Sequence, residues 1–198
     1  ATVRRDGSSR FARGHRFGTF PSVSAGWNIS NENFMESART WLDFLKIRAS
    51  WGRVGNQNVD NYQYLAPIKT TNTHYFFGQY IGPNGQLTNY SPVLSENWGA
   101  YPSRLGNLDL TWETSEQTDL GFDARLFNSR LGVNFDYYIK KNKDWLVKAP
   151  VLATAGTDAP FINGGSVKNY GVELALTWND VIGRDFSYSL SVNGAYNK

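Results

Sequence analysis

Hydrophobic and polar residues alternate with a period of two along much of this chain. In 171–179 (GVELALTWN), Val172, Leu174 and Leu176 share one parity, and polar or small residues lie between them. Successive side chains of a β-strand point to opposite faces, so this period predicts strands and not helices. The same alternation is present in 21–30, 46–52, 110–126, 131–140 and 186–196. We predict an antiparallel, all-β fold with these six strands, a seventh near 2–6, and further pieces at 62–66 or 74–81.

The connections between these strands differ strongly in length. Residues 127–130 (FNSR) and 179–185 predict tight turns, whereas 57–107 and 147–168 are long and rich in Gly, Pro, Asn and Tyr. Compact soluble domains rarely carry loops of that length unless the loops have a function. Between two strands, 32–45 predicts a short helix with Asn31 as its N-cap.

Composition narrows the chemistry. The 198 residues include 7 Trp, 11 Tyr and 12 Phe, two His and no Cys, and the formal net charge is +3. Without cysteine there is no disulfide framework, thiolate nucleophile or cysteine-based zinc site. His15 and His74 are far apart in the sequence. We therefore expect no metal and no cofactor.

The residues also lack the helical signals of membrane targeting. No run of 18 apolar residues is present, so no transmembrane helix is expected. No apolar segment of the signal-peptide type is present near residue 1 either.

Two kinds of all-β protein fit the alternation. In a soluble β-sandwich, such as a carbohydrate-binding module, the apolar faces form a core. In an outer-membrane barrel, the apolar face meets lipid and the polar face lines the lumen. The pattern within one strand does not separate these two interpretations.

Three features favour the barrel. The polar parity is built of small, neutral residues with few Lys or Glu, unlike an exposed soluble sheet. Short turns alternate with long loops, as in outer-membrane barrels. Aromatic residues stand near the ends of apolar runs, where a membrane-interface girdle needs them. The candidate girdle residues are Trp27, Trp51, Trp112, Tyr137 and Trp178.

Five segments, in this order, carry a family resemblance. They are RRDGSSRF (4–11), RFGTFPSVSAGWNIS (16–30), LKIRASWGRVGNQ (45–57), NLDLTWETSEQTDLGFDARLFNSRLGVNFDYY (107–138) and GSVKNYGVELALTW (165–178). The chain closely resembles the C-terminal half of the barrel in SusC/RagA-like TonB-dependent outer-membrane transporters. The resemblance covers nearly the whole chain, and the ordered set of segments is more specific than any single one.

The resemblance implies an up-and-down transmembrane β-barrel of about 22 strands with a plug in its lumen. Residues 1–198 are then a partial barrel of about 7–8 strands from that single domain, in the bacterial outer membrane, with the plug and both chain termini missing. Such transporters take up a glycan oligosaccharide or a peptide. A SusD-like surface lipoprotein covers the outside, and the TonB complex acts through the plug. The implied strand directions make 7–16, about 55–107 and about 148–165 extracellular.

On this interpretation, one set of charges faces the lumen, because a charge near the middle of the lipid face costs about 2–4 kcal/mol. The set is Lys46, Arg48, Asp119, Asp123, Arg125, Asp136, Lys140 and Glu173. These residues either pair with one another and with the plug, or contact the substrate directly.

Aromatic residues in the long loop form a second candidate set, because aromatic rings stack on the apolar faces of sugars. The substrate-binding candidates are Tyr75, Phe76, Phe77, Tyr80, Trp98 and Tyr101. The alternative is that these rings pack within the loop or against the lipoprotein.

Two further features point away from other functions. The first 16 residues hold five arginines and one aspartate, but no nucleic-acid-binding motif accompanies them, so a loop touching outer-membrane lipid and lipopolysaccharide is favoured over nucleic acid. Glu113 and Glu116 have opposite parity, so they lie on opposite faces and do not flank one glycosidic bond. We expect no enzymatic activity.

Overall fold

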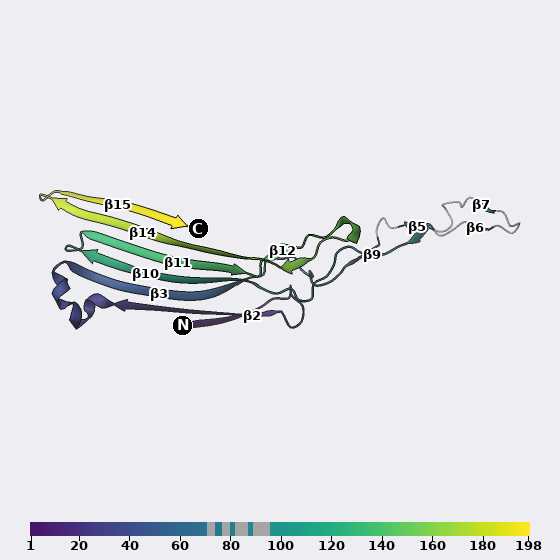
Figure 1. The fold of residues 1–198 in the computed structure, drawn as a ribbon, viewed down its shortest axis with the longest axis horizontal. Helices are drawn as coiled ribbons and strands as arrows, with labels where there is room; N and C mark the ends of the chain where they lie inside the picture. The colour runs from purple at the N-terminus through teal and green to yellow at the C-terminus, as the bar shows by residue number, and fades with distance from the viewer. Residues whose placement is uncertain (71–73, 77–79, 82–86, 89–95) are drawn as a thin grey trace.

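The computed structural model describes residues 1–70, 74–76, 80–81, 87–88 and 96–198. Its main element is one antiparallel sheet of seven strands in the order β1-β2-β3-β10-β11-β14-β15 (Figure 1). The strands are β1 (Thr2–Gly7), β2 (Phe17–Asn28), β3 (Leu42–Asn56), β10 (Glu113–Leu126), β11 (Leu131–Lys143), β14 (Ser166–Ile182) and β15 (Phe186–Asn197). The predicted all-β antiparallel fold and its seven strands are confirmed. β1 and β15 form the two edges of the sheet.

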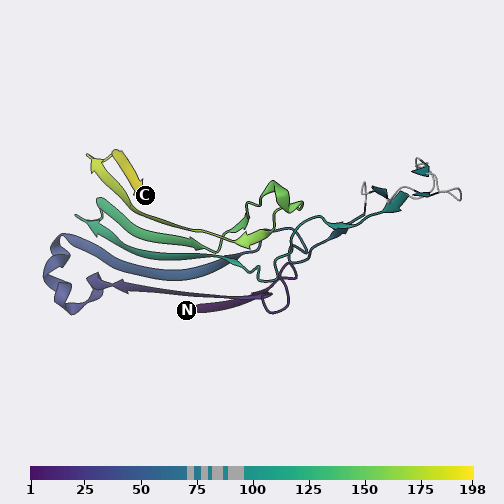
Figure 2. The same ribbon diagram turned by 45° about the vertical axis from the view of Figure 1, so that its right-hand side comes forward.

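Tight turns lie at one end of the sheet, and the two longest connections lie at the other. Residues 29–41, 127–130 and 183–185 connect strands at one end, and residues 8–16, 57–112 and 144–165 connect them at the other. Figures 1 and 2 show the sheet as a curved layer, with the long connections leaving its right-hand end. The predicted tight turns and long loops thus lie at opposite ends, although the connection 29–41 is longer than the connection 8–16.

The long connections contain short β-ribbons. β4 (Ile68–Lys69) pairs with β9 (Tyr101–Pro102), β5 (His74–Phe76) with β8 (Glu96–Trp98), and β6 (Tyr80–Ile81) with β7 (Leu87–Thr88). β12 (Leu146–Lys148) pairs with β13 (Phe161–Asn163), and the short 3-10 helix η3 spans Ala153–Ala155. Strand pieces thus occur within 74–81, whereas 62–66 contains no strand.

The predicted helix over 32–45 is wrong in type and extent. The segment forms two 3-10 helices, η1 (Ile29–Asn31) and η2 (Asn33–Thr40), and Leu42 already begins β3. Asn31 is not a cap: Glu32 occupies the N-cap position of η2 and makes no side-chain capping bond. Instead, Trp27 Nε1 donates a hydrogen bond of 2.9 Å to Glu32 Oε1. The helix is short because Leu42 is buried and paired with Leu126, which takes the chain back into the sheet.

Strand register sorts the side chains onto two faces. One rung of directly opposed residues runs Ala25, Ala49, Leu120, Tyr137 and Val172 across five strands, and we call this side the apolar face. The next rung, one residue along, runs Gly26, Arg48, Gly121, Asp136 and Glu173, and we call this side the polar face.

The apolar face is exposed. The side chain of Leu120, in the middle of the sheet, is 51% exposed, and Leu174 and Ile47 are similarly open. Within the described residues, no second sheet packs against this face. The sandwich interpretation requires such a layer, so the structure favours the barrel. No helix among the described residues is long and apolar enough to span a membrane.

A small buried cluster lies at the long-connection end. It consists of Phe11, Phe20, Val59, Leu110 and Trp112. The Trp112 ring centroid is 5.4 Å from that of Phe11 and 5.5 Å from that of Phe20. The cluster therefore packs residues of the connections 8–16 and 57–112 against the start of β2.

The position of Trp112 differs from the one predicted for a girdle residue. The side chain is only 6% exposed, and its Nε1 donates a hydrogen bond of 3.2 Å to the carbonyl oxygen of Arg16. The alternation predicted a strand from residue 110, but β10 begins at Glu113. Trp112 precedes the strand and turns into the buried cluster, so it does not present its ring to lipid.

Candidate functional site

The strand register brings the eight predicted charges onto the polar face. Lys46 and Arg48 lie on β3, Asp119, Asp123 and Arg125 on β10, Asp136 and Lys140 on β11, and Glu173 on β14. All eight have the parity of the Arg48 rung. Four strands thus contribute charges to one surface, and that surface is the candidate site.

Arg48 is the centre of this surface. Its Nε lies 2.9 Å from Asp123 Oδ2, and its Nη2 lies 3.0 Å from Asp123 Oδ1. The same Nη2 lies 3.1 Å from Asp136 Oδ1. One guanidinium therefore bridges carboxylates on β10 and β11, and all three side chains are between a quarter and two-fifths exposed. A planar guanidinium with several donors suits this double contact better than an ammonium group would.

The bridge depends on a glycine between its two ends. Gly121 lies opposite Arg48 on one side and opposite Asp136 on the other. A Cβ placed on Gly121 would overlap the Asp136 carboxylate and would lie 2.7 Å from the carbonyl oxygen of Phe135. The missing side chain at Gly121 leaves the space that Arg48 and Asp136 use to meet.

Neutral side chains hold the neighbouring carboxylates. Ser50 Oγ donates a hydrogen bond of 3.1 Å to Asp119 Oδ2, and Gln117 Nε2 donates one of 3.0 Å to Asp119 Oδ1. Asn134 Nδ2 donates one of 2.7 Å to Asp123 Oδ1. These partners were not singled out from the sequence, although each has the polar-face parity that would have identified it.

The other four predicted charges lie around this centre. Lys46 is opposite Asp123, and Lys140 is opposite Gln117. Glu173 is directly opposite Asp136 on the neighbouring strand. Arg125 is placed over the ring of Phe44, with its Cζ 5.8 Å from the ring centroid.

Two hollows open on the polar face. One, of about 300 Å³, is lined by Lys46, Arg48, Asp119 and Asp136 together with small residues of β2, β3 and β10. The other, of about 580 Å³, reaches from Asp119 and Lys140 to Phe20 near the long-connection end. Both are open troughs with charged and hydroxyl-bearing walls, so the face can bind polar groups by hydrogen bonds without enclosing them.

The described residues assemble no metal-binding cluster, and Glu113 and Glu116 have separate partners. Within the described residues, no group of three or more His, Asp or Glu side chains is placed to hold a metal ion. Glu116 accepts a hydrogen bond of 3.1 Å from Trp51 Nε1 and pairs with Lys143 Nζ at 3.1 Å. Glu113 instead accepts from the backbone N–H of Leu146.

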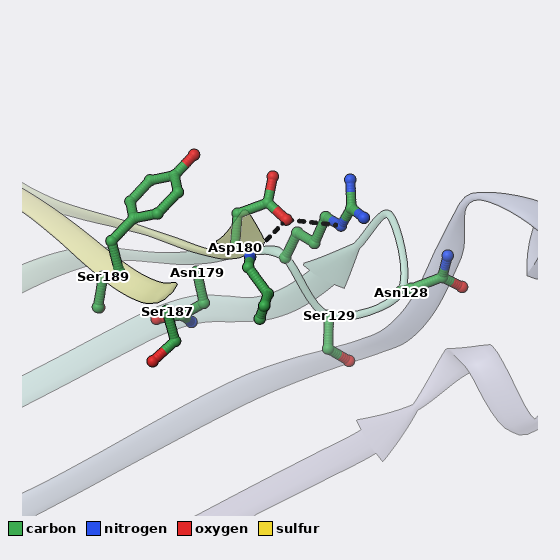
Figure 3. Close-up of a pocket in the computed structure, with 9 residues that line it drawn as sticks. Asn128, Ser129, Asn179, Asp180, Ser187 and Ser189 are labelled. Atoms are coloured by element: carbon green, nitrogen blue, oxygen red, sulfur yellow. Dashed lines mark hydrogen bonds and ion pairs between the residues drawn. The ribbon is translucent and has the colours of Figure 1, made fainter. Parts of the chain in front are cut away.

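A further pocket lies at the short-turn end, between the β10–β11 turn and the β14–β15 hairpin (Figure 3). Its volume is about 520 Å³, and Asn128, Asn179, Asp180 and Ser187 are among its lining residues. Asp180 Oδ1 accepts from the backbone N–H of Val181 and pairs with Arg130 Nε at 3.4 Å. This ion pair links the turn to the hairpin (Figure 3). The contact therefore serves to hold the two segments together.

The other predicted girdle residues lie on the apolar face. Trp27, Tyr137 and Trp178 belong to its rungs, and Trp27 is 52% exposed. Trp51 is at the end of this face nearest the long connections, opposite Thr118 and Val23. The structure itself contains no lipid, so the girdle role of these four remains a prediction.

The loop aromatics are spread over the ribbons of the long connection. Tyr75 and Phe76 belong to β5, Tyr80 to β6 and Trp98 to β8, while Phe77 lies outside the described residues. Tyr101 lies on β9, where it is paired with Lys69 of β4, and is exposed. The substrate-binding prediction for this set stays a prediction.

One charged feature was missed by the sequence reasoning. Arg53, Glu116, Lys141 and Lys168 form a single rung across β3, β10, β11 and β14, on the apolar-face parity. This rung lies beyond the apolar rungs, toward the long connections. The signal was present: Glu116 shares the parity of Leu120 and Phe122 and is the charged exception among them.

Comparisons with known proteins agree with this geometry. The β-barrel model of the TonB dependent receptor-like proteins matches residues 1–198. The chain belongs to the TonB-dependent receptor family.

Individual relatives and solved structures show which members of this family the chain is similar to. The chain is 36% identical to TonB-dependent receptor SusC of Bacteroides thetaiotaomicron over 200 residues, covering 99% of this chain and 18% of that protein. It is 34% identical to TonB-dependent receptor P3 of Formosa agariphila over 197 residues, covering 100% of this chain and 18% of that protein.

The solved RagAB peptide importer in its "open-open" state superposes with a TM-score of 0.76 at 32% identity, covering 99% of this chain and 19% of that one. These proteins are receptors and importers, and the resemblance to SusC/RagA-like transporters is confirmed. The chain spans less than a fifth of the length of each of them.

Proposed function

We propose that this chain forms seven adjacent strands in the wall of an outer-membrane transporter that takes up a nutrient in a TonB-dependent manner. The single observation that supports this most strongly is the two-faced sheet. Its register gathers eight charges on one face and leaves large apolar side chains exposed on the other. An apolar face of this size is stable only against lipid or another apolar layer, and a polar face suits a water-filled lumen.

The polar face is then the lumen wall. A charge-assisted bridge such as Arg48 with Asp123 and Asp136 is well suited to stiffen the wall, because it ties three neighbouring strands together. The troughs beside it present hydrogen-bonding groups to the plug or to passing substrate. The long connections are proposed to be extracellular, which puts the short turns in the periplasm.

The proposed nutrient and partners are those that the resemblance to SusC/RagA-like transporters implies. The proposed substrate is a glycan oligosaccharide or a peptide; the RagAB relative is a peptide importer. A SusD-like lipoprotein is the proposed extracellular partner, and the TonB complex is the proposed periplasmic one, acting through a plug. The exposed aromatic Tyr101 and the rings of the neighbouring ribbons are the proposed contacts of the long connection with substrate or lipoprotein.

Localisation and uptake of the full-length protein test this function separately. It should fractionate with outer membranes, require detergent for extraction and migrate differently on gels before and after heating. Recovery as a water-soluble monomer contradicts the barrel. Cells with and without the gene are then compared for uptake of labelled oligosaccharides and peptides, with and without a proton uncoupler. Equal, uncoupler-insensitive uptake of every compound contradicts TonB-dependent transport.

The sandwich module gains no support from the structure. It requires a second layer over Leu120, Leu174 and their neighbours, and the described residues contain none.

A further inference from the structure

A row of basic side chains borders the apolar face at the long-connection end. The rung of Arg53, Glu116, Lys141 and Lys168 crosses four strands, and Lys143 lies one rung further out on the same face. We call Arg53, Lys141, Lys143 and Lys168 the basic row. Four cations stand here beside the one carboxylate of Glu116.

That carboxylate is already engaged. Glu116 accepts from Trp51 Nε1 and pairs with Lys143, so it neutralises one cation of the row and is anchored to an aromatic ring. Lys168 Nζ lies over the ring of Tyr170, 5.8 Å from its centroid. Lys141 and Lys168 are exposed. The row therefore keeps ammonium groups accessible from outside the sheet.

A pocket of about 590 Å³ lies among these lysines. Lys141, Lys143 and Lys168 line it, together with Asp144, Gly165, Ser166 and Val167. Three lysines and one serine line this hollow beside a single acidic residue, and this composition favours an anion with several oxygen acceptors. Phosphate is such a group.

The position of the row selects the source of that phosphate. The rung just inside it holds Trp51 and Tyr170, the aromatic end of the apolar face. The step from that rung to Lys168 is about 7 Å along the strand, the length of two residues. Phosphate headgroups lie in the interfacial zone immediately outside the hydrocarbon, where Trp and Tyr collect. A soluble substrate passes through the lumen on the opposite face.

We propose that the basic row binds the phosphate groups of an anionic lipid in the outer leaflet, such as a phosphorylated glycolipid. This proposal rests on the proposed function, because it needs the apolar face to be embedded in lipid. Lysines close to an anionic surface each add attraction, and salt weakens it. The row would fix the height of the barrel wall in the membrane and surround it with charged lipid.

The test uses the full-length protein in nanodiscs of neutral phosphatidylcholine, with phosphorylated or fully dephosphorylated lipid A added. Bound lipid is counted by native mass spectrometry. The variant Lys141→Gln/Lys143→Gln/Lys168→Gln should lose roughly tenfold or more of its affinity for the phosphorylated lipid. Wild type should prefer the phosphorylated form, and this preference should fall as salt rises.

Lys140→Gln is the matched control, since Lys140 is adjacent to Lys141 but lies on the polar face. It should bind phosphorylated lipid A as wild type does. An equal loss in this control, or equal binding of the two lipids by wild type, overturns the proposal. Competition by free pyrophosphate at the same concentration as lipid also overturns it, since the site would then take a soluble anion. If the triple variant fails to fold, Lys141→Gln alone and the salt dependence of wild type give the same decision.

Fractionation of wild type separates this result from the proposed function. If the protein fractionates with the outer membrane but shows no preference for phosphorylated lipid A, only the lipid-binding proposal is contradicted, and the proposed function stands.

Discussion

Arg48 on β3 and Asp136 on β11 form an ion pair across the strand that separates them. Their Nη2 and Oδ1 atoms are 3.1 Å apart, although β10 lies between the two strands. The contact exists because Gly121, the residue of β10 that faces both, has no side chain. A direct pairing normally joins adjacent strands, where opposed Cβ atoms are about 5 Å apart. Here the long Arg48 side chain crosses the glycine to reach the second strand.

Gly121→Ala should therefore destabilise the barrel wall. The added Cβ overlaps the Asp136 carboxylate, and Asp136 alone cannot relieve it, because the Phe135 carbonyl oxygen is also within 2.7 Å. We expect a loss of about 1–3 kcal/mol, the usual cost of overpacking. The free energy of unfolding of the full-length protein in urea with lipid vesicles measures it.

Gly132→Ala is the control for this prediction. Gly132 is on the same face, but a Cβ there would meet only Thr177, at 3.7 Å or more, which is ordinary contact. Its unfolding free energy should stay within about 0.5 kcal/mol of wild type. Similar losses in both variants would mean that the glycine effect is one of strand propensity and not of the ion pair.

Arg48→Met should weaken the wall by removing the cation shared by Asp123 and Asp136. Because these side chains are partly exposed, we expect a coupling energy between Arg48→Met and Asp136→Asn of about 0.5–1 kcal/mol at low salt. The double-mutant cycle should show a smaller coupling at high salt. Lys140→Met with Asp136→Asn is the comparison cycle, since Lys140 is opposite the uncharged Gln117 and Asn169. A coupling as large there contradicts a specific Arg48 pair.

Leu174→Arg and Ala175→Arg should separate the two faces of the sheet. Leu174 lies on the apolar face between Phe135 and Gly194, and Ala175 lies on the polar face between Asn134 and Asn193. An arginine near the middle of a lipid face costs about 2–4 kcal/mol. We expect Leu174→Arg to lower the amount of folded, heat-modifiable barrel in outer membranes, and Ala175→Arg to lower it much less. Reversal of that order would place lipid on the polar face.

Trp112→Ala should destabilise the packing of residues 8–16 and 57–70 against the sheet. The ring packs between Phe11 and Phe20, and its removal leaves a cavity that costs about 3–5 kcal/mol. Hydrogen exchange and proteolysis should increase in residues 8–16 and 57–70 while the strands stay protected.

Trp112→Phe keeps a six-membered ring in the cluster but loses the rest of the indole and the hydrogen bond to the Arg16 carbonyl, which is worth about 1 kcal/mol. Its effect in both measurements should therefore be clearly smaller than that of Trp112→Ala. Unchanged exchange in Trp112→Ala would show that the buried cluster does not hold the connections.

The sequence predicted the sheet well where alternation was regular. Period-two patterning located six of the seven strands, and parity put each of the eight charges on the polar side of its own strand. Parity failed at Trp112, because the alternation runs through residue 110 without a break, while the strand begins at Glu113. The helix predicted over 32–45 failed for a different reason, because Leu42 pairs with Leu126 and already belongs to β3.

What the sequence by itself determined is which side chains share a face, since that follows from a local period of two. Only the tertiary structure decided which of them meet. Arg48 and Asp136 are 88 residues apart, and their contact depends on the strand order and on the register that sets Gly121 between them. The basic row likewise required four strands in register, because its members come from segments separated by long loops. Register is set by pairing between distant strands, and a pattern within one strand does not contain it.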